Sequence, residues 1–218
     1  MLKAGMHFGR KKTVFNPKMK KYVFSIKEGI CIIDLLKTQT ELSAAADYMK
    51  NIMTNGGMIL FVALTKQSVD SVKDLALALN MPYVVDRWLG GTLTNFKIIS
   101  GRVKQLEEME KQQKTGGLDK YTKKERLLFE REMKKMDKNF GGIRKLTKLP
   151  DAVFVSSMKD SALPIREARR IKIPIVAIAN TDSDPAEASY IIPANDRSKR
   201  SVDLIVEALK KELTRDAQ

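Results

Sequence analysis

Residues 84–95 read VVDRWLGGTLTN, and the character of the chain changes at this stretch. It holds the only tryptophan, Trp88, beside the glycine pair Gly90-Gly91. Before it, short apolar runs alternate with helical patterns, whereas residues 96–148 are polar and strongly basic. Apolar runs resume at Asp151. We therefore interpret residues 84–95 as the exit from a buried sheet into an inserted arm.

The segment before this stretch shows the alternation of strands and helices that is typical of an α/β protein. Residues 58–64 form a continuous apolar run, as expected of a strand that is buried on both faces. Thr38 or Thr40 is expected to cap the first helix, and Ser68 the second. The pattern predicts strands at 22–26 and 30–33 (a hairpin or two short strands), 58–64 and 82–85, and helices at 38–55 and 68–80.

The segment after residue 150 returns to the same alternation. Apolar runs predict strands at 152–156, 175–179 and 190–192, and amphipathic spacing predicts helices at 161–171 and 198–214. Strands that alternate with helices indicate a parallel sheet with right-handed crossovers. The sequence therefore predicts about five parallel strands with helices on both faces.

The inserted segment predicts two helices joined by a short turn. Helices are expected over 95–113 and 121–146, with Thr115-Gly116-Gly117 as the turn. In the second helix, apolar residues recur at a mean spacing of 3.5, the signature of a coiled-coil contact; they are Phe129, Met133, Met136, Phe140 and Ile143. We expect an α/β core from residues 1–95 and 149–218, and an antiparallel helical hairpin from residues 96–148.

The positive charge is confined to two segments. The whole chain of 218 residues carries a formal net charge of +14. Residues 1–27 contain eight Lys/Arg and no acid, and residues 102–148 contain fifteen Lys/Arg against eight Asp/Glu. The rest of the chain sums to −1. Such an excess favours an anionic partner, nucleic acid first and a membrane surface second.

The first 21 residues predict an irregular arm that offers cations to phosphates. Gly5, Gly9 and Asn16-Pro17 interrupt any helix there, and lysines alternate with apolar residues. We predict RNA contacts from Lys11, Lys12, Lys18, Lys20 and Lys21 of the arm, Arg87 and Asn95 of residues 84–95, and Arg102, Lys104, Lys134, Lys135, Arg144 and Lys145 of the hairpin. Trp88 is interpreted as a packing anchor rather than a stacking platform.

Catalysis finds little support in the residue types present. His7 is the only histidine, so a histidine pair for proton transfer or metal binding is excluded. Gly90-Gly91-Thr92 sits where phosphate loops occur but lacks their glycine spacing, which favours a tight turn. The two carboxylates of residues 180–185 could hold magnesium, although a capped turn is favoured. We predict no catalytic residue, no cofactor and no metal ligand.

Other features limit the location of the protein. The single cysteine, Cys31, excludes an internal disulfide and fits a reducing compartment. No apolar run approaches the roughly 20 residues of a membrane span. No apolar segment of about 7–15 residues follows the basic N-terminus, so a secretory signal is not expected.

Several blocks closely resemble the bacterial family of small-subunit ribosomal protein two, in the family's order and over nearly the whole chain. The blocks are GMHFG at 5–9, NPKM at 16–19, GICIIDL at 29–35, RWLGGTLTN at 87–95, PDAVFV at 150–155, IPIVA at 173–177 and IPAND at 192–196. The basic hairpin resembles the coiled-coil insertion of the bacterial form. Two departures are visible: Arg10 stands where the family often has a second histidine, and Arg197, Lys199 and Arg200 add charge where it tends to be acidic or neutral.

The resemblance implies a doubly wound, flavodoxin-like fold and a structural role in the small ribosomal subunit of a bacterial cytoplasm. It implies binding to small-subunit rRNA, contacts with neighbouring ribosomal proteins and help in docking small-subunit ribosomal protein one. No homo-oligomer and no membrane partner are expected, and any magnesium would be structural and held through rRNA. The alternatives are a small-molecule enzyme on the same fold and a non-specific binder of nucleic acid or membrane surfaces.

Overall fold

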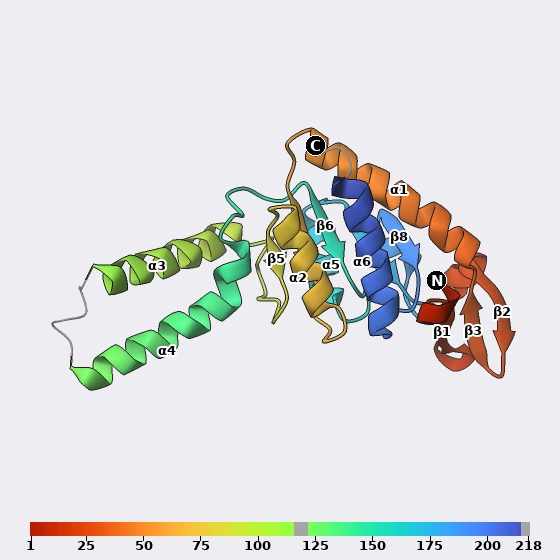
Figure 1. Cartoon of the computed structure of the whole chain (residues 1–218), viewed down its shortest axis with the longest axis horizontal. Coiled ribbons are helices and arrows are strands. Elements are labelled where there is room, and N and C mark those ends of the chain that lie inside the picture. Colours follow the sequence, from red (N-terminus) through yellow and green to blue (C-terminus); the bar gives the residue numbers. More distant parts are fainter. Residues whose placement is uncertain (116–121, 215–218) are drawn as a thin grey trace.

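The centre of the molecule is a five-stranded parallel sheet, as the sequence predicts (Figure 1). The computed structural model describes residues 1–115 and 122–214. The strand order is β5-β4-β6-β7-β8, and β4 pairs with β6 from Ile59 opposite Ala152 to Val62 opposite Val155. The strands are β4 (Ile59–Val62), β5 (Tyr83–Val84), β6 (Ala152–Val155), β7 (Ile175–Ala179) and β8 (Tyr190–Pro193).

The two faces of this sheet are covered by different kinds of structure. Alternate residues of each strand point to opposite faces, so that β4 sends Ile59 and Phe61 to one apolar cluster and Leu60 and Val62 to the other. The first cluster is completed by the helices α1 (Leu35–Thr54), α2 (Val69–Ala78) and α6 (Lys199–Thr214). The second is completed by α5 (Ala162–Arg170), the N-terminal arm, residues 84–95 and the base of the hairpin.

The N-terminal arm is more ordered than the sequence predicts. Its strand β1 (Phe8–Lys11) belongs to an antiparallel three-stranded sheet in the order β1-β3-β2. The other two strands, β2 (Val23–Lys27) and β3 (Ile30–Ile33), follow the arm in the chain. Short 3-10 turns, η1 (Leu2–Ala4), η2 (Lys12–Val14) and η3 (Pro17–Tyr22), make up most of the rest. The predicted hairpin is confirmed, but the prediction of an irregular 1–21 is wrong because β1 pairs with β3. The sequence FGRK lacks the apolar alternation that signals a strand.

One predicted helix cap is wrong, and the other is confirmed in position only. Helix α1 begins at Leu35, three residues before Thr38, because the Asp34 side chain accepts a hydrogen bond from the Leu36 amide at 3.1 Å. The Thr38 hydroxyl lies inside the helix and donates to the Pro193 carbonyl at 2.6 Å. Ser68 occupies the cap position of α2, but its side chain makes no capping bond.

The inserted hairpin consists of α3 (Phe96–Lys114) and α4 (Lys123–Phe140), followed by the 3-10 turn η4 (Gly141–Ile143). Both helices project from the β5 edge of the sheet (Figure 1). Thr122 and Glu125 form a capping box at the start of α4. The second helix was predicted to end at residue 146, whereas α4 ends at Phe140. Gly116 and Gly117 of the predicted turn, and Tyr121 at the predicted start of the second helix, lie outside the described residues.

The base of the hairpin shares the core of the sheet. Leu106 and Met109 of α3 and Met136 and Phe140 of α4 belong to the same apolar cluster as Val62 of the sheet. The coiled-coil contact predicted from the spacing is therefore present at the base and runs directly into the main core. The division into a core domain and a hairpin domain stays a prediction.

Candidate nucleic-acid interface

Residues 84–95, called the pivot loop below, are folded around one buried carboxylate. Glu167 of α5 is 6 % exposed and accepts hydrogen bonds from Trp88 Nε1 at 3.0 Å and from the Gly91 amide at 2.8 Å. The amides of Leu93 and Thr94 donate to its other oxygen at 3.0 and 3.2 Å. Burial raises the pKa of Glu167, but these hydrogen bonds outweigh burial, and the pKa lies below its usual value.

This arrangement decides between two interpretations of Gly90-Gly91-Thr92. A phosphate loop needs free backbone N–H groups, yet the amides of Gly91, Leu93 and Thr94 already donate to Glu167. The glycine pair is therefore part of a turn, and Gly91 adopts a φ of +89° that favours glycine. Trp88, which is 5 % exposed, is a packing anchor as predicted.

Glu167 was missed by reasoning from the sequence, although a signal exists. Pro164, Ile165 and Ala168 share the buried face of α5 with Glu167. An acid on the apolar face of a helix requires a partner, and the helical pattern over residues 161–171 would have shown it. The partner itself could not be found in this way, because the pivot loop lies more than 70 positions earlier in the chain.

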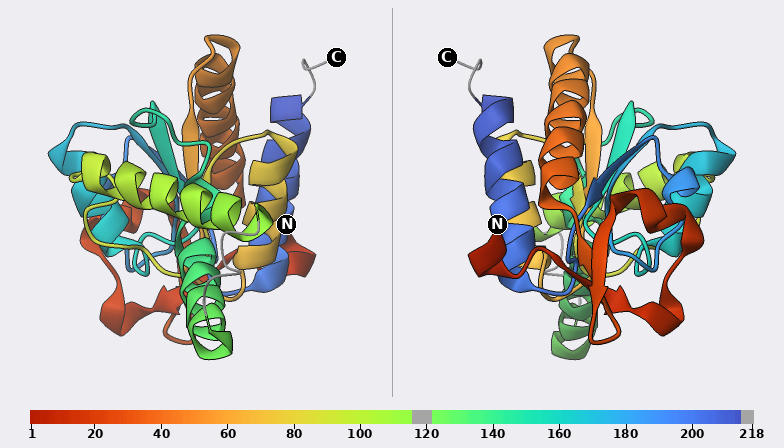
Figure 2. Two further views of the ribbon diagram at one scale, coloured as in Figure 1. Left: turned by 90° about the vertical axis from the view of Figure 1, so that its left-hand side faces the viewer. Right: turned by 90° about the vertical axis from the view of Figure 1, so that its right-hand side faces the viewer.

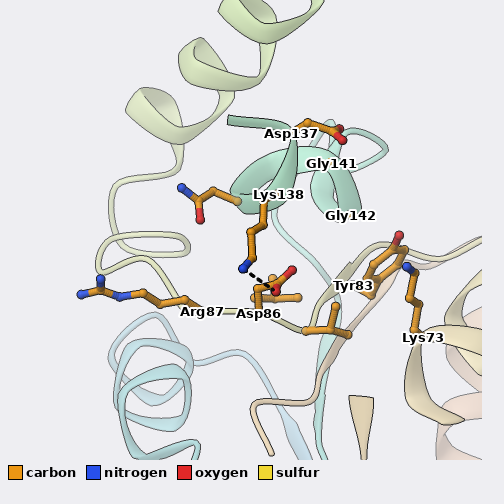
Figure 3. A pocket seen from close by; sticks show the side chains of 11 residues that line it. Lys73, Tyr83, Asp86, Arg87, Asp137, Lys138, Gly141 and Gly142 are labelled. Atoms are coloured by element: carbon orange, nitrogen blue, oxygen red, sulfur yellow. Dashed lines mark ion pairs between the residues drawn. The ribbon is translucent and has the colours of Figure 1, made fainter. Parts of the chain in front are cut away.

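The pivot loop presents both of its predicted RNA-contacting residues to solvent. Arg87 and Asn95 are exposed, and Asn95 makes no side-chain capping bond to α3. Arg87 borders a polar pocket of about 250 Å³ between the loop and the end of α4, where Lys138 Nζ lies 3.5 Å from Asp86 Oδ1 (Figure 3). The Arg87 guanidinium points away from this ion pair and is available to a partner.

The hairpin brings two predicted cations together in one groove. Arg102 of α3 and Lys135 of α4 line a hollow of about 450 Å³, together with Arg131, which was not predicted. Buried Met136 and Phe140 also line it. Lys104 and Lys134 are exposed on the same two helices but do not line this groove. We call Arg102, Arg131 and Lys135 the groove cations.

The last two predicted hairpin residues make contacts within the protein. Arg144 forms a two-pronged pair with Glu110, at 2.8 and 2.6 Å, and its Nη2 lies 2.5 Å from Asp137 Oδ1. The Arg144 guanidinium lowers the pKa of Glu110 by hydrogen bonding. Lys145 Nζ donates to the Asn80 side chain. The Arg144 contacts join α3 to α4, and the Lys145 contact reaches the residues that follow α2, so the RNA contacts predicted for this pair compete with internal partners.

The cations of the N-terminal arm divide into free and engaged groups. Lys11, Lys12 and Lys20 are exposed, and within residues 1–115 and 122–214 their side chains form no hydrogen bond or ion pair. Lys18 Nζ lies 2.6 Å from Asp184 Oδ2, and Lys21 Nζ lies 4.7 Å from the centroid of the Tyr22 ring. The free lysines can neutralise phosphates directly, whereas Lys18 must share its charge.

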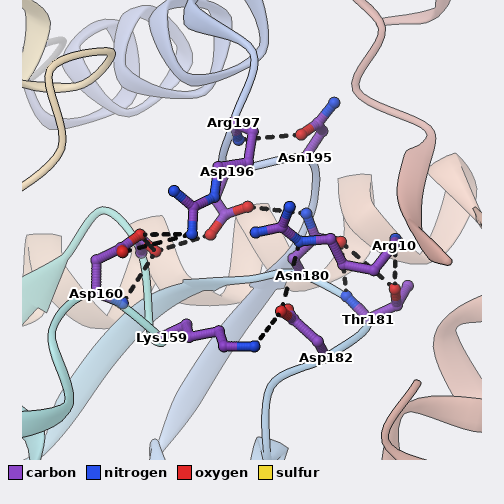
Figure 4. A network of polar contacts seen from close by, with 10 residues as sticks. Arg10, Lys159, Asp160, Asn180, Thr181, Asp182, Asn195, Asp196 and Arg197 are labelled. Carbon is purple, nitrogen blue, oxygen red and sulfur yellow. Dashed lines mark hydrogen bonds and ion pairs between the residues drawn. The ribbon is translucent and has the colours of Figure 1, made fainter. Parts of the chain in front are cut away.

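The arm also covers the edge of the sheet at which ligands of such folds bind. The Arg10 amide donates to Thr181 Oγ1 at 2.8 Å, and the Asn195 amide donates to the Met6 carbonyl at 3.0 Å. Below this cover, the buried Asp196 accepts hydrogen bonds from Asn180 and Ser157 at 2.8 and 2.7 Å (Figure 4). The carboxyl edge is thus filled by the protein's own arm and polar network.

The two carboxylates considered for magnesium are engaged elsewhere. Asp182 lies 3.4 Å from Arg10 Nε and 3.1 Å from Lys159 Nζ (Figure 4). Asp184 accepts from the Ala186 amide at 2.9 Å and so caps a 3-10 turn, η5 (Pro185–Glu187), as the capped-turn interpretation predicts. Across residues 1–115 and 122–214, no cluster of three or more His, Cys, Asp or Glu side chains is arranged to hold a metal ion.

A second surface of the arm is apolar. A groove of about 600 Å³ runs over the small N-terminal sheet and the start of α1, where Phe24 is 74 % and Leu36 is 77 % exposed. The ring of Phe8 also lines it and packs against the His7 ring, with the two centroids 4.1 Å apart and the planes tilted by 36°. Exposed apolar side chains gathered in one groove are typical of a protein-docking surface.

Comparison with known proteins gives one family match. A family model described as Ribosomal protein S2 matches residues 1–215 of the 218-residue chain. The match therefore covers the parallel sheet, the arm, the pivot loop and both hairpin helices. In the described part of the chain, each helix is too short or too polar to cross a membrane.

Proposed function

Because the chain belongs to the ribosomal protein S2 family, a family of structural constituents of the small ribosomal subunit, we propose that it binds small-subunit rRNA through its hairpin and its arm. The observation that carries the proposal is the gathering of the groove cations from two helices of the hairpin, around buried apolar side chains. The proposed role is structural rather than catalytic, and the proposed location of the protein is the bacterial cytoplasm.

The hairpin groove suits RNA because it combines charge with an apolar lining. Arginine guanidinium groups bind phosphate oxygens with two parallel hydrogen bonds and also stack on bases. Arg102, Arg131 and Lys135 lie around Met136 and Phe140, which could accept the edge of an unstacked base. Specific RNA recognition commonly uses such unstacked bases, whereas helical RNA is recognised by its shape.

The arm and the hairpin are placed to grip separate RNA helices. The hairpin leaves the sheet at β5, and the small N-terminal sheet lies at the other end of the molecule, beyond β8 (Figure 1). Each neutralised phosphate releases counterions, so that binding weakens as salt rises. With about six phosphate contacts, we expect affinity to fall on the order of a thousandfold between about 50 and 200 mM salt.

The apolar groove of the arm is assigned to a protein partner. Phe8, Phe24 and Leu36 would be costly to leave in water and are unsuited to phosphates. We assign this groove to small-subunit ribosomal protein one, with neighbouring ribosomal proteins completing the surroundings. A homo-oligomer and a cofactor form no part of this proposal, except for magnesium ions held through the rRNA.

The test compares two charge-matched variants. Arg102→Gln, Arg131→Gln and Lys135→Gln together remove three charges from the groove. Arg200→Gln, Lys210→Gln and Lys211→Gln, called the α6 control below, remove three exposed charges from α6. Binding is measured on small-subunit rRNA transcribed in vitro, and incorporation by sedimentation of the tagged chain with small subunits. We expect weaker binding for the groove variant alone.

Three outcomes would contradict the proposal. Absence of the tagged wild-type chain from the small-subunit fraction would remove the structural role. Equal binding of both variants would remove the groove. Displacement of rRNA by duplex DNA or by anionic vesicles at equal concentration would indicate a non-specific binder, and micromolar binding of nucleotides with magnesium in calorimetry would favour an enzyme.

A further inference from the structure

Helix α5 presents three arginines on one exposed face. Arg166, Arg169 and Arg170 follow the i, i+3, i+4 spacing that places side chains side by side on a helix. All three are exposed. Arg169 Nη1 lies 3.6 Å from Glu187 Oε1, whereas Arg166 and Arg170 form no ion pair with any residue in 1–115 or 122–214. Two of the three guanidinium groups are therefore available to a ligand.

The surface around these arginines is hollowed rather than convex. One depression of about 390 Å³ is lined by all three arginines and by Glu187. A second, of about 280 Å³, is lined by Arg169 and Lys172. Because Arg169 lines both, the two depressions adjoin, and four cations border them. We call Arg166, Arg169, Arg170 and Lys172 the α5 cations.

Stabilisation of the helix alone does not account for this charge. Cations near the end of a helix interact favourably with its dipole, which explains Arg169 and Arg170 in the last turn but not Arg166 in the middle of the helix. The single acid of α5, Glu167, points inward to the pivot loop and does not offset the outer face. The helices on the opposite face of the sheet, α1, α2 and α6, carry seven Lys/Arg and seven Asp/Glu and so sum to zero.

The position of α5 connects the two basic regions already assigned to RNA. Its inner face holds the pivot loop through Glu167, and the pivot loop leads into the hairpin. Its outer face adjoins η5, where Glu187 pairs with Arg169 and the neighbouring Asp184 pairs with Lys18 of the arm. Both views in Figure 2 place α5 on the same side of the molecule as the loops of the arm.

We propose that the α5 cations form a third binding surface, for the phosphates of the RNA backbone, which joins the arm and the hairpin into one positive track. This inference rests on the proposed rRNA binding and deepens it. Arginine forks match the geometry of phosphate oxygens, and a hollow lined by several forks can hold adjacent phosphates. Contacts to phosphates fix the position of an RNA and carry no sequence information directly, so this surface positions the RNA rather than specifying its sequence.

The test uses Arg166→Gln, Arg169→Gln and Arg170→Gln together, against the α6 control. Binding to in vitro transcribed small-subunit rRNA is measured over a series of salt concentrations. Each lost phosphate contact lowers the slope of log affinity against log salt by about one. We expect the α5 variant to lose about two to three from this slope and to bind on the order of ten- to a hundredfold more weakly at low salt. The α6 control should match the wild type.

The outcomes separate this inference from the function on which it rests. If the α5 variant and the α6 control bind alike while the groove variant is weakened, the α5 surface is refuted and rRNA binding stands. If the wild-type protein does not bind rRNA, the proposed function is refuted, and the inference that rests on it is refuted with it. If the α5 variant binds free rRNA normally but is lost from small subunits, the occupant is a protein and the RNA assignment is wrong. Equal midpoints of urea denaturation for the variant and wild type would show that the variant is folded, so that a lower salt slope reports lost phosphate contacts. If the variant has a lower midpoint, the salt series is repeated with Arg166→Gln alone. An unchanged salt slope for that single variant would refute the surface.

Discussion

The N-terminal arm and the hairpin carry similar excess charge but are held in opposite ways. The arm is fastened along its length, since the Arg10 and Asn16 amides bond to Thr181 and the Met6 carbonyl bonds to Asn195. The hairpin projects from the β5 edge of the sheet (Figure 1), and its described contacts include the Arg144–Glu110 pair and the Lys138–Asp86 pair with the pivot loop. Equal charge therefore does not imply equal support.

The difference has a physical consequence for RNA binding. A surface that is already fixed loses little conformational entropy when it meets a ligand. The arm can present its lysines in this way, because its backbone is paired to the sheet edge. The direction of the hairpin, in contrast, depends on a few contacts at its base, and a small change there is amplified along two helices of about 28 Å. Substitutions at the base of the hairpin should therefore affect the protein more than substitutions in the arm.

The largest expected effect comes from Glu167→Ala, which tests the support of the hairpin. It leaves the Trp88 indole and the pivot-loop amides buried without an acceptor, and each such group is costly. We expect a loss of about 3–5 kcal/mol in the free energy of unfolding, measured by urea denaturation. Glu107→Ala, an exposed change in α3, should stay within about 0.5 kcal/mol. Similar losses for both would mean that the pivot loop does not depend on this carboxylate.

Gly9→Ala tests the support of the arm and has the next largest expected effect. A Cβ at this position would lie 2.6 Å from Thr181 Cγ2 and 2.8 Å from the Cys31 carbonyl oxygen, and a backbone oxygen cannot move aside easily. We expect a loss of about 1–3 kcal/mol in stability from this overlap. Gly90→Ala is the control, because a Cβ there meets open space. An unchanged urea midpoint for Gly9→Ala would show that the arm is not closely applied to the sheet.

Most of the core was predictable because each element carries its own pattern. The apolar run at 58–64 predicted a buried strand, which the structure shows at Ile59–Val62. The spacing of Met133, Met136 and Phe140 predicted the contact between the hairpin helices. The arm was not predictable as β1 because Phe8–Lys11 is half exposed and has no apolar alternation. Its place over the sheet edge depends on backbone bonds to Thr181 and Asn195, which leave no trace in a single sequence.

The predicted RNA contacts stay predictions, and the structure shows only where their side chains lie. Charge totals located the arm and the hairpin, and the structure places Arg102 and Lys135 in one groove. Arg144 was counted as a contact because the helical pattern does not show that Glu110 faces it. The α5 arginines were overlooked because acids elsewhere in the core neutralise them in any sum. The net charge of a segment shows only that the segment is basic, whereas binding depends on which face of the folded protein carries each charge.

Acid pH should weaken the hairpin support by a smaller amount than Glu167→Ala. The pKa of Glu167 is lowered in the folded state, so its contribution is present above the unfolded pKa of about 4.3 and is lost as pH falls below that value. The loss is smaller because a neutral carboxyl still accepts one or two of the bonds. We expect the urea midpoint of wild type to fall more steeply between about pH 5 and 3 than that of Glu167→Gln. Parallel profiles would assign the acid sensitivity to other carboxylates.

The smallest expected effect has the opposite sign and tests how loosely the hairpin is packed away from its base contacts. Gly101 lies inside α3, and a Cβ there would meet nothing within 4 Å. Alanine restricts the unfolded chain and favours helix, so Gly101→Ala should stabilise the protein by about 0.5–1 kcal/mol, measured as a higher urea midpoint. Alanine at Gly9 of the arm offers no such gain in stability, because the overlap of its Cβ with neighbouring atoms outweighs the effect on the unfolded chain. Destabilisation by Gly101→Ala would therefore show that this part of α3 is covered as closely as the arm, and the contrast between the two regions would fail.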